Sequence, residues 1–72
     1  MEDFSLKFGK KLAEARVSLD LSQTKAAIAS GLLQSDISRF EQGNYIGVKA
    51  LKYLVFLRSQ DIDLNNIFDI HS

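Results

Sequence analysis

The stretch LSQTKAAIASGLLQSDISRFEQG, residues 21–43, decides the fold that we expect for this chain. Its first half has helical character and is preceded by Ser22, a residue type whose side chain readily caps the N-terminus of a helix. Gly31 follows, and glycine is best suited to the left-handed position at which helices end. Ala27 is small where a second helix must approach closely. The pattern predicts a short helix that begins at Gln23 and is followed by a sharp turn.

A second short helix is predicted over residues 34–42, and Gly43 is expected to end it. Ile37 and Phe40 define its buried face, because residues three apart lie on the same side of a helix. The opposite face carries the polar residues Gln34, Ser35, Ser38 and Arg39. Residues 22–42 together therefore predict a helix-turn-helix.

Amphipathic helices are expected on both sides of this unit. Upstream, apolar residues recur at steps of three and four and predict a helix over residues 4–19, with a turn at Asp20. The apolar stripe of that helix consists of Phe4, Phe8, Leu12, Ala15 and Leu19. Downstream, we expect a helix over residues 48–59 and a last short helix capped by Asp63 and reaching residue 68. The core stripe expected for the helix over 48–59 is Val48, Leu51, Leu54 and Val55.

The composition limits the classes of protein that remain. Seventy-two residues allow a single domain, 1–72, and the periodicities predict an all-α fold of five helices. The chain has no cysteine and one histidine, so that disulfides and a thiolate metal site are excluded. No secretory leader or membrane-spanning run is recognisable, and a cytoplasmic protein is expected. The net charge is zero, whereas nucleic-acid-binding proteins are usually basic.

The run over residues 21–43 resembles the helix-turn-helix of the lambda-repressor and Cro-like (XRE) family. The pattern of that family reads L-S-Q-x-x-L-A, then G, then I-S-R-x-E-x-G, and it aligns here without a gap. Upstream, FGKKLAEAR, residues 8–16, resembles the first helix of the family. The resemblance extends to about Leu54 and implies a five-helix, lambda-repressor-like DNA-binding domain.

The resemblance also implies roles for individual residues. Gln23 matches a glutamine that contacts a DNA phosphate, and Ser38 matches a position that contacts either a base or a phosphate. Positions that reach base edges in the major groove are matched by Gln34, Ser35 and Arg39. Lys25 is interpreted either as a phosphate contact or as part of a solvated face. Asn44, in the loop after the second helix of the motif, completes the candidate DNA-binding set.

Other positions in and beside the motif bear on its structure. Arg16 and Glu41 match a pair that forms a buried ion pair between the first and third helices of the family. Leu33 stands where the family usually has a small capping residue, so that the third helix is expected to begin without a side-chain cap. Asp36 favours the helix dipole but would repel a nearby phosphate, although it could accept a hydrogen bond from cytosine N4. Arg39 is interpreted as a base contact or as a solvated residue that pairs with Asp36.

Apolar residues near the C-terminus exceed what a core of this size needs. They are explained either by a tail that folds back over the helix at 48–59 or by a dimer interface. We favour the dimer, because a neutral monomer that reads few base pairs would bind weakly. The expected interface lies within residues 60–70 and consists of Leu64, Ile67, Phe68 and Ile70.

The function expected from these patterns is sequence-specific binding of double-stranded DNA by a homodimeric transcriptional repressor. The alternative is a protein-interaction module, such as an antitoxin-like protein that masks a toxin-like partner. Zero net charge and the apolar C-terminal segment motivate that alternative. No nucleophile has a histidine poised beside it, so that enzyme activity is not expected. No cofactor, metal, small-molecule ligand or membrane partner is expected either.

Overall fold

The computed structural model describes residues 4–44 and 47–68, and within these ranges the chain forms five α-helices and no strand. The helices are α1 (Phe4–Ser18), α2 (Gln23–Ser30), α3 (Gln34–Glu41), α4 (Gly47–Ser59) and α5 (Leu64–Phe68). The predicted all-α class and number of helices are confirmed. No helix in this part of the chain is long and apolar enough to cross a membrane.

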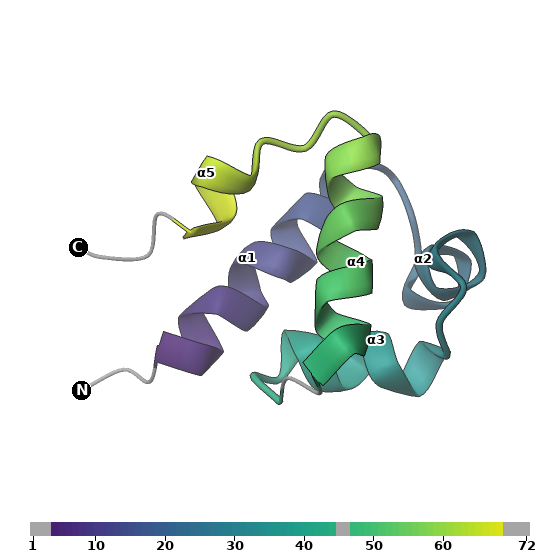
Figure 1. Cartoon of the computed structure of the whole chain (residues 1–72), viewed down its shortest axis with the longest axis horizontal. Helices are drawn as coiled ribbons and strands as arrows, with labels where there is room; N and C mark the ends of the chain where they lie inside the picture. The colour runs from purple at the N-terminus through teal and green to yellow at the C-terminus, as the bar shows by residue number, and fades with distance from the viewer. Residues whose placement is uncertain (1–3, 45–46, 69–72) are drawn as a thin grey trace.

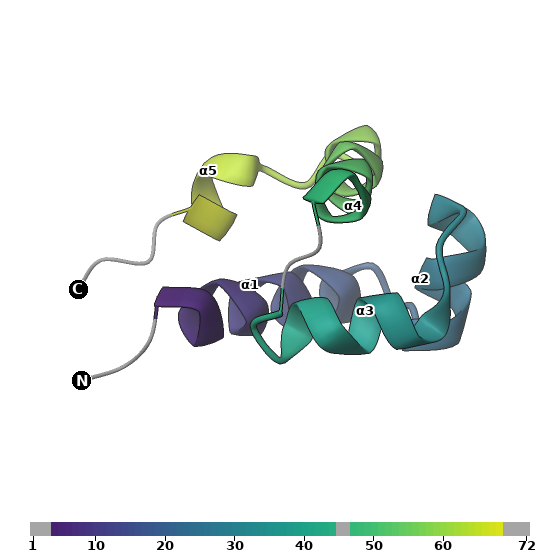
Figure 2. The same ribbon diagram turned by 60° about the horizontal axis from the view of Figure 1, so that its bottom comes forward.

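Two helices distant in sequence, α1 and α3, contact each other and run at an angle in Figure 1, and they form one layer in the view of Figure 2. Helix α4 crosses this layer, α2 stands at one end, and α5 lies at the other end beside α1 (Figure 2). The core fills the space between α4 and the layer, with fully buried side chains from α1, α3 and α4. The largest of these are Tyr53, Phe40, Leu12, Ile37 and Leu57.

Helix α1 presents the predicted apolar stripe to the core, since Phe8, Leu12 and Ala15 are buried there and Leu19 packs against them. The side chain of Phe4, also predicted for this stripe, lies outside the described residues. Asp20 ends the helix with a φ of 60°, the left-handed conformation expected at this turn.

Gly9 allows α1 and α3 to touch through their backbones. A Cβ atom at this position would lie 2.5 Å from the carbonyl oxygen of Glu41 and 2.9 Å from that of Phe40. Both neighbours are backbone atoms of α3, so that neither is able to move aside without shifting the helix. The close packing of the two helices therefore depends on the absence of a side chain at this position.

Helix α2 begins and ends as predicted. The Oγ atom of Ser22 accepts a hydrogen bond of 3.1 Å from the backbone N–H of Lys25. Gly31 ends the helix with a φ of 75°, which carries the chain into the turn before α3. Ala26 and Ala27 are buried in the face that meets the neighbouring helices. The predicted capping, turn and small inner face are thus confirmed.

Helix α4 buries a different face from the one predicted. Val48, Leu51 and Val55, expected in the core, are 80%, 60% and 62% exposed. Tyr53 and Leu57 are fully buried instead, with Leu54 packed beside them as predicted. The helix is apolar around most of its circumference, so that two stripes with the same helical spacing were available. The stripe that is buried contains Tyr53, whose aromatic ring packs against that of Phe40.

Helix α5 folds back on the domain and contacts mainly α1 and, less extensively, α4. Ile67 is 2% exposed and belongs to the core, and Leu64 packs against it. The dimer interface predicted at Ile67 is therefore wrong, because this side chain is already buried within its own chain. The side chain of Phe68 and the whole of Ile70, assigned to the same interface, lie outside the described residues.

Tyr53 carries a polar group into the core. Its ring lies between those of Phe40 and Phe56, with centroid separations of 5.7 Å and 6.1 Å. The hydroxyl oxygen is buried and has no hydrogen-bond partner among the described residues. Burial, together with the charge of Glu41, raises the pKa of Tyr53 to about 12.

We predict that Gly9→Ala destabilises the domain by about 1–3 kcal/mol, because the added methyl group overpacks the contact between α1 and α3. This loss outweighs the better helix propensity of alanine, which is worth up to about 1 kcal/mol. Urea unfolding followed by circular dichroism measures the difference. Val17→Ala, at a position 63% exposed on the same helix, is the control and should change stability by less than about 0.5 kcal/mol. An equally stable Gly9→Ala variant would contradict the close contact.

We predict that Tyr53→Phe leaves the domain at least as stable at neutral pH, because it removes a buried hydroxyl without a partner. The folded state keeps the phenol neutral, with a pKa of about 12 against 10.0 for the model compound. The folded state therefore binds this proton more tightly than the unfolded state, and the unfolding free energy of the wild type falls as the pH rises from 10 towards 12. Unfolding free energies measured across this range should fall more steeply for the wild type than for Tyr53→Phe. Parallel curves would show that the hydroxyl is not buried.

Candidate nucleic-acid interface

Helix α3 has one buried face and one exposed face. Ile37 and Phe40 are fully buried, as predicted. On the opposite side, Gln34, Ser35 and Arg39 are exposed and Ser38 is half-buried. Figure 2 shows α3 at the front of the molecule, with no other helix covering its outer side. The structure thus brings together on one surface the four residues that the sequence placed on the outer face of this helix.

Arg16 and Glu41 join α1 to α3. The Nε atom of Arg16 donates to Oε2 of Glu41 at 2.6 Å, and Nη2 donates to Oε1 at 3.2 Å. The third nitrogen, Nη1, donates to the backbone carbonyl of Leu21 at 2.7 Å. The two side chains are only 15% and 9% exposed, and the hydrogen bond to Glu41 raises the pKa of Arg16 further. The ion pair implied by the family resemblance is therefore confirmed.

The same carboxylate holds Gln23 directly and Gln34 through Gln23. The amide nitrogen Nε2 of Gln23 donates to Oε1 of Glu41 at 3.0 Å. The Oε1 atom of Gln23 in turn accepts a hydrogen bond of 2.6 Å from Nε2 of Gln34. Gln34 keeps its amide oxygen and one amide hydrogen for other partners. A continuous chain of hydrogen bonds therefore runs from the interior at Arg16 to the surface at Gln34.

Asp36 is turned away from the exposed face of α3. Its side chain is 2% exposed, and Oδ2 accepts a hydrogen bond of 3.1 Å from the backbone N–H of Leu33. Its Oδ1 atom lies 3.6 Å from Nζ of Lys49 on α4. The alternative in which Arg39 pairs with Asp36 is therefore wrong, because Asp36 pairs with Lys49 instead. The reason is helical spacing, because Asp36 lies four residues before buried Phe40 and shares its face.

The start of α3 agrees with the prediction that Leu33 provides no side-chain cap. The carboxylate of Asp36 supplies the reciprocal bond instead, by accepting from the N–H of the N-cap residue. The sequence shows the acidic residue of this motif, three positions after the N-cap. It does not show that the side chain of Asp36 points into the protein.

The charges of α3 are consequently segregated. Its two carboxylates, those of Asp36 and Glu41, are held by Lys49 and Arg16 away from the outer face. Arg39 is exposed and has no side-chain partner among the described residues. A protein with zero net charge thus presents a helix face whose only formal charge, within the described ranges, is positive.

The remaining candidate residues border this face. Lys25 is exposed in the first turn of α2, and Asn44 is exposed beyond α3, where its backbone N–H donates to the carbonyl of Arg39 at 2.8 Å. Gln42, which the sequence analysis did not include, donates from Nε2 to Oγ of Ser38 at 2.8 Å. Its position, four residues after Ser38, was the signal that it shares the outer face.

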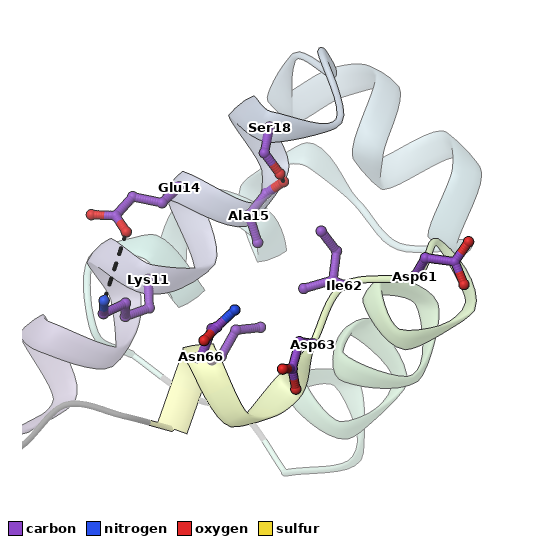
Figure 3. Close-up of a pocket in the computed structure, with 9 residues that line it drawn as sticks. Lys11, Glu14, Ala15, Ser18, Asp61, Ile62, Asp63 and Asn66 are labelled. Carbon is purple, nitrogen blue, oxygen red and sulfur yellow. Dashed lines mark hydrogen bonds and ion pairs between the residues drawn. The ribbon is translucent and has the colours of Figure 1, made fainter.

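A hollow lies between α1, the connection from α4 to α5, and α5 itself (Figure 3). Lys11 and Glu14 form an exposed pair beside it, with Nζ and Oε1 4.0 Å apart. Ile62 points into the hollow towards Ala15, whereas Asp61 points away from it. Within the described ranges, no three acidic, histidine or cysteine side chains gather to hold a metal ion. The polar residues that line the hollow, among them Glu14, Asp61, Asp63 and Asn66, are exposed to solvent, and the outer face of α3 is the stronger candidate.

No known protein family, curated protein or solved structure matches this chain.

We predict that Glu41→Ala destabilises the domain by about 3–5 kcal/mol, because it leaves the Arg16 guanidinium buried without its partner. The double variant Arg16→Met/Glu41→Leu should lose less stability than Arg16→Met and Glu41→Leu lose together, and thermal unfolding of all three measures this coupling. Glu14→Ala, which removes the exposed partner of Lys11, is the control and should cost less than about 1 kcal/mol. Additive losses in the double variant would show that the two side chains act independently.

Proposed function

We propose that this chain is a sequence-specific double-stranded DNA-binding protein with a lambda-repressor-like arrangement, in which α2 and α3 form the helix-turn-helix. In this proposal the outer face of α3 enters the major groove, which is wide enough to admit an α-helix. The observation that carries it is the hydrogen-bond chain from Arg16 through Glu41 and Gln23 to Gln34.

That chain supports the proposal because reading a base requires a side chain whose position is set before binding. A glutamine free to rotate would lose side-chain entropy when it binds DNA, whereas Gln34 is already hydrogen-bonded at one end. Its free amide oxygen and remaining amide hydrogen match the donor and acceptor that adenine presents in the major groove. Arg39 carries the guanidinium that matches O6 and N7 of guanine.

The surrounding residues supply contacts with the DNA backbone. Gln23 and Lys25 stand at the start of α2, where backbone N–H groups and the helix dipole favour a phosphate. Asn44 borders α3 at its other end. Ser38 is held by Gln42 and is assigned to either a base or a phosphate. Burial of Asp36 removes the one carboxylate of α3 that the sequence placed against DNA.

In this proposal the protein regulates transcription as a dimer. Two copies whose α3 helices lie about 34–36 Å apart read successive major grooves on one side of the duplex. A dimer bound across a promoter represses transcription by excluding the polymerase. Because Ile67 is buried in its own chain, the proposed dimer contact at the C-terminus consists of the remaining candidates, Leu64, Phe68 and Ile70.

Selection of bound duplexes from a random pool at physiological salt tests the proposal. We expect the recovered sites to share one short motif, repeated as an inverted pair with half-site centres about 10 base pairs apart. Recovery of no preferred sequence would reject sequence-specific binding. A preferred motif that occurs singly would keep DNA reading and reject the dimer.

Arg39→Ala should relax one base-pair position of the recovered motif and cost about 1–3 kcal/mol of binding free energy. Fluorescence anisotropy with the selected duplex and its single-base variants measures both effects. Arg58→Ala is the matched control, because it removes the same charge from an exposed position on α4. It should leave the base preference unchanged. A preference that is the same in Arg39→Ala as in the wild type would remove Arg39 from the reading surface.

A further inference from the structure

Helix α4 has a second apolar face that its own chain does not cover. Val48, Leu51 and Val55 follow the spacing i, i+3, i+7 and are 80%, 60% and 62% exposed. They lie opposite the buried side of the helix, which contains Tyr53 and Leu57. No described helix passes in front of α4 in Figure 1 or above it in Figure 2. Soluble monomers rarely leave a continuous apolar stripe of this kind in water.

The stripe continues beyond α4 into a groove. Val48 lines this groove together with Leu33, which precedes α3 and is 64% exposed. Gly31 and Lys52 line the same groove, and Nζ of Lys52 lies 3.4 Å from the carbonyl oxygen of Gly31. Exposed apolar side chains from the turn before α3 and from α4 therefore form one surface. We call Leu33, Val48, Leu51 and Val55 the α4 surface.

The exposed charged side chains beside the α4 surface are basic, and the one carboxylate that lines the groove, that of Asp36, is buried and paired with Lys49. Lys52 and Arg58 flank the stripe on its two sides, and both are exposed. Lys49 is also 51% exposed, although its ammonium group lies 3.6 Å from Asp36. The sequence of α4, GVKALKYLVFLRS, contains no acidic residue. An occupant of this surface must therefore offer apolar side chains between negative ones.

A second copy of the chain does not meet this requirement. In a symmetric dimer the same patch faces itself, so that the basic flanks of the stripe, which carry Lys52 and Arg58, would meet basic rather than acidic side chains. Like charges brought together across an interface oppose association. We propose that the α4 surface binds an amphipathic helical segment of another protein, with apolar residues at i, i+3 and i+7 and acidic residues on both flanks. Figure 2 shows α4 and α3 on different sides of the molecule, and the α4 surface reaches α3 only at its N-cap residue, Leu33.

The test begins with a displayed library of helical peptides that carry leucine at i, i+3 and i+7 and vary between glutamate, glutamine and lysine on the flanks. Selection against the full chain should enrich glutamate. An enriched peptide is then synthesised, and its affinity is measured by fluorescence anisotropy. Because the flanking contacts are ionic and exposed, the affinity should weaken as salt is raised.

Val55→Glu and Val17→Glu form a matched pair of variants, since these valines are 62% and 63% exposed on different helices. Val55→Glu should weaken binding of the enriched peptide at least about tenfold, and Val17→Glu less than about twofold. Leu51→Ser, which adds no charge, should also weaken binding. Circular dichroism of each variant checks the fold, and Leu51→Ser decides the outcome if Val55→Glu does not fold.

Three results would overturn the proposal. The first is a selection that enriches no peptide or enriches glutamine or lysine on the flanks. The second is equal weakening by Val55→Glu and Val17→Glu, which would place the peptide elsewhere. The third is self-association of the wild type in sedimentation equilibrium that Val55→Glu abolishes, because this would assign the α4 surface to a second copy.

Discussion

The bidentate ion pair between Arg16 and Glu41 is the interaction on which the rest of the structure depends. It joins α1 to α3, and the third guanidinium nitrogen ties the same arginine to the backbone at Leu21, where α2 is about to begin. Three segments are thus fixed relative to one another by one side chain that is largely removed from water. The pair forms because Gly9 lets the backbones of α1 and α3 approach so closely that a methyl group would not fit. A buried pair of this kind stabilises little by itself, yet loss of either partner leaves an uncompensated charge.

The same constraint connects the interior with the surface. Glu41 holds Gln23, and Gln23 holds Gln34, so that the rotation of α3 and the orientation of its first polar side chain are set together. Binding surfaces gain affinity when their side chains are ordered in advance by a second set of contacts. In the proposed function, a change at the buried end of this chain alters DNA reading without touching DNA. The carboxylate of Asp36, held against Lys49 and the start of α3, leaves the exposed face with the positive charge of Arg39.

The sequence was sufficient to predict local structure at positions where a residue type has one common structural role. Ser22 and Gly31 marked the ends of α2, and the spacing of Ile37 and Phe40 identified the buried face of α3. It was insufficient in α4, because that helix is apolar around most of its circumference and periodicity cannot choose between two equivalent stripes. Asp36 was misplaced for a related reason. A carboxylate in a first turn is usually solvated, and the structure shows that this one is buried on the face of Phe40, with Lys49 of α4 as its partner.

Titration of the isotopically labelled protein with a duplex enriched by selection tests the central claim most directly. The observed quantities are the backbone amide shifts and the side-chain amide shifts of the glutamines, followed by nuclear magnetic resonance. If α3 reads DNA, the largest changes fall on its outer face, at the side-chain amides of Gln34 and Gln42 and the backbone around Arg39, while the outer face of α4 stays unchanged. Changes concentrated on α4 or α5, or no change at α3 when the duplex is bound, would contradict the assignment of α3 as the reading helix.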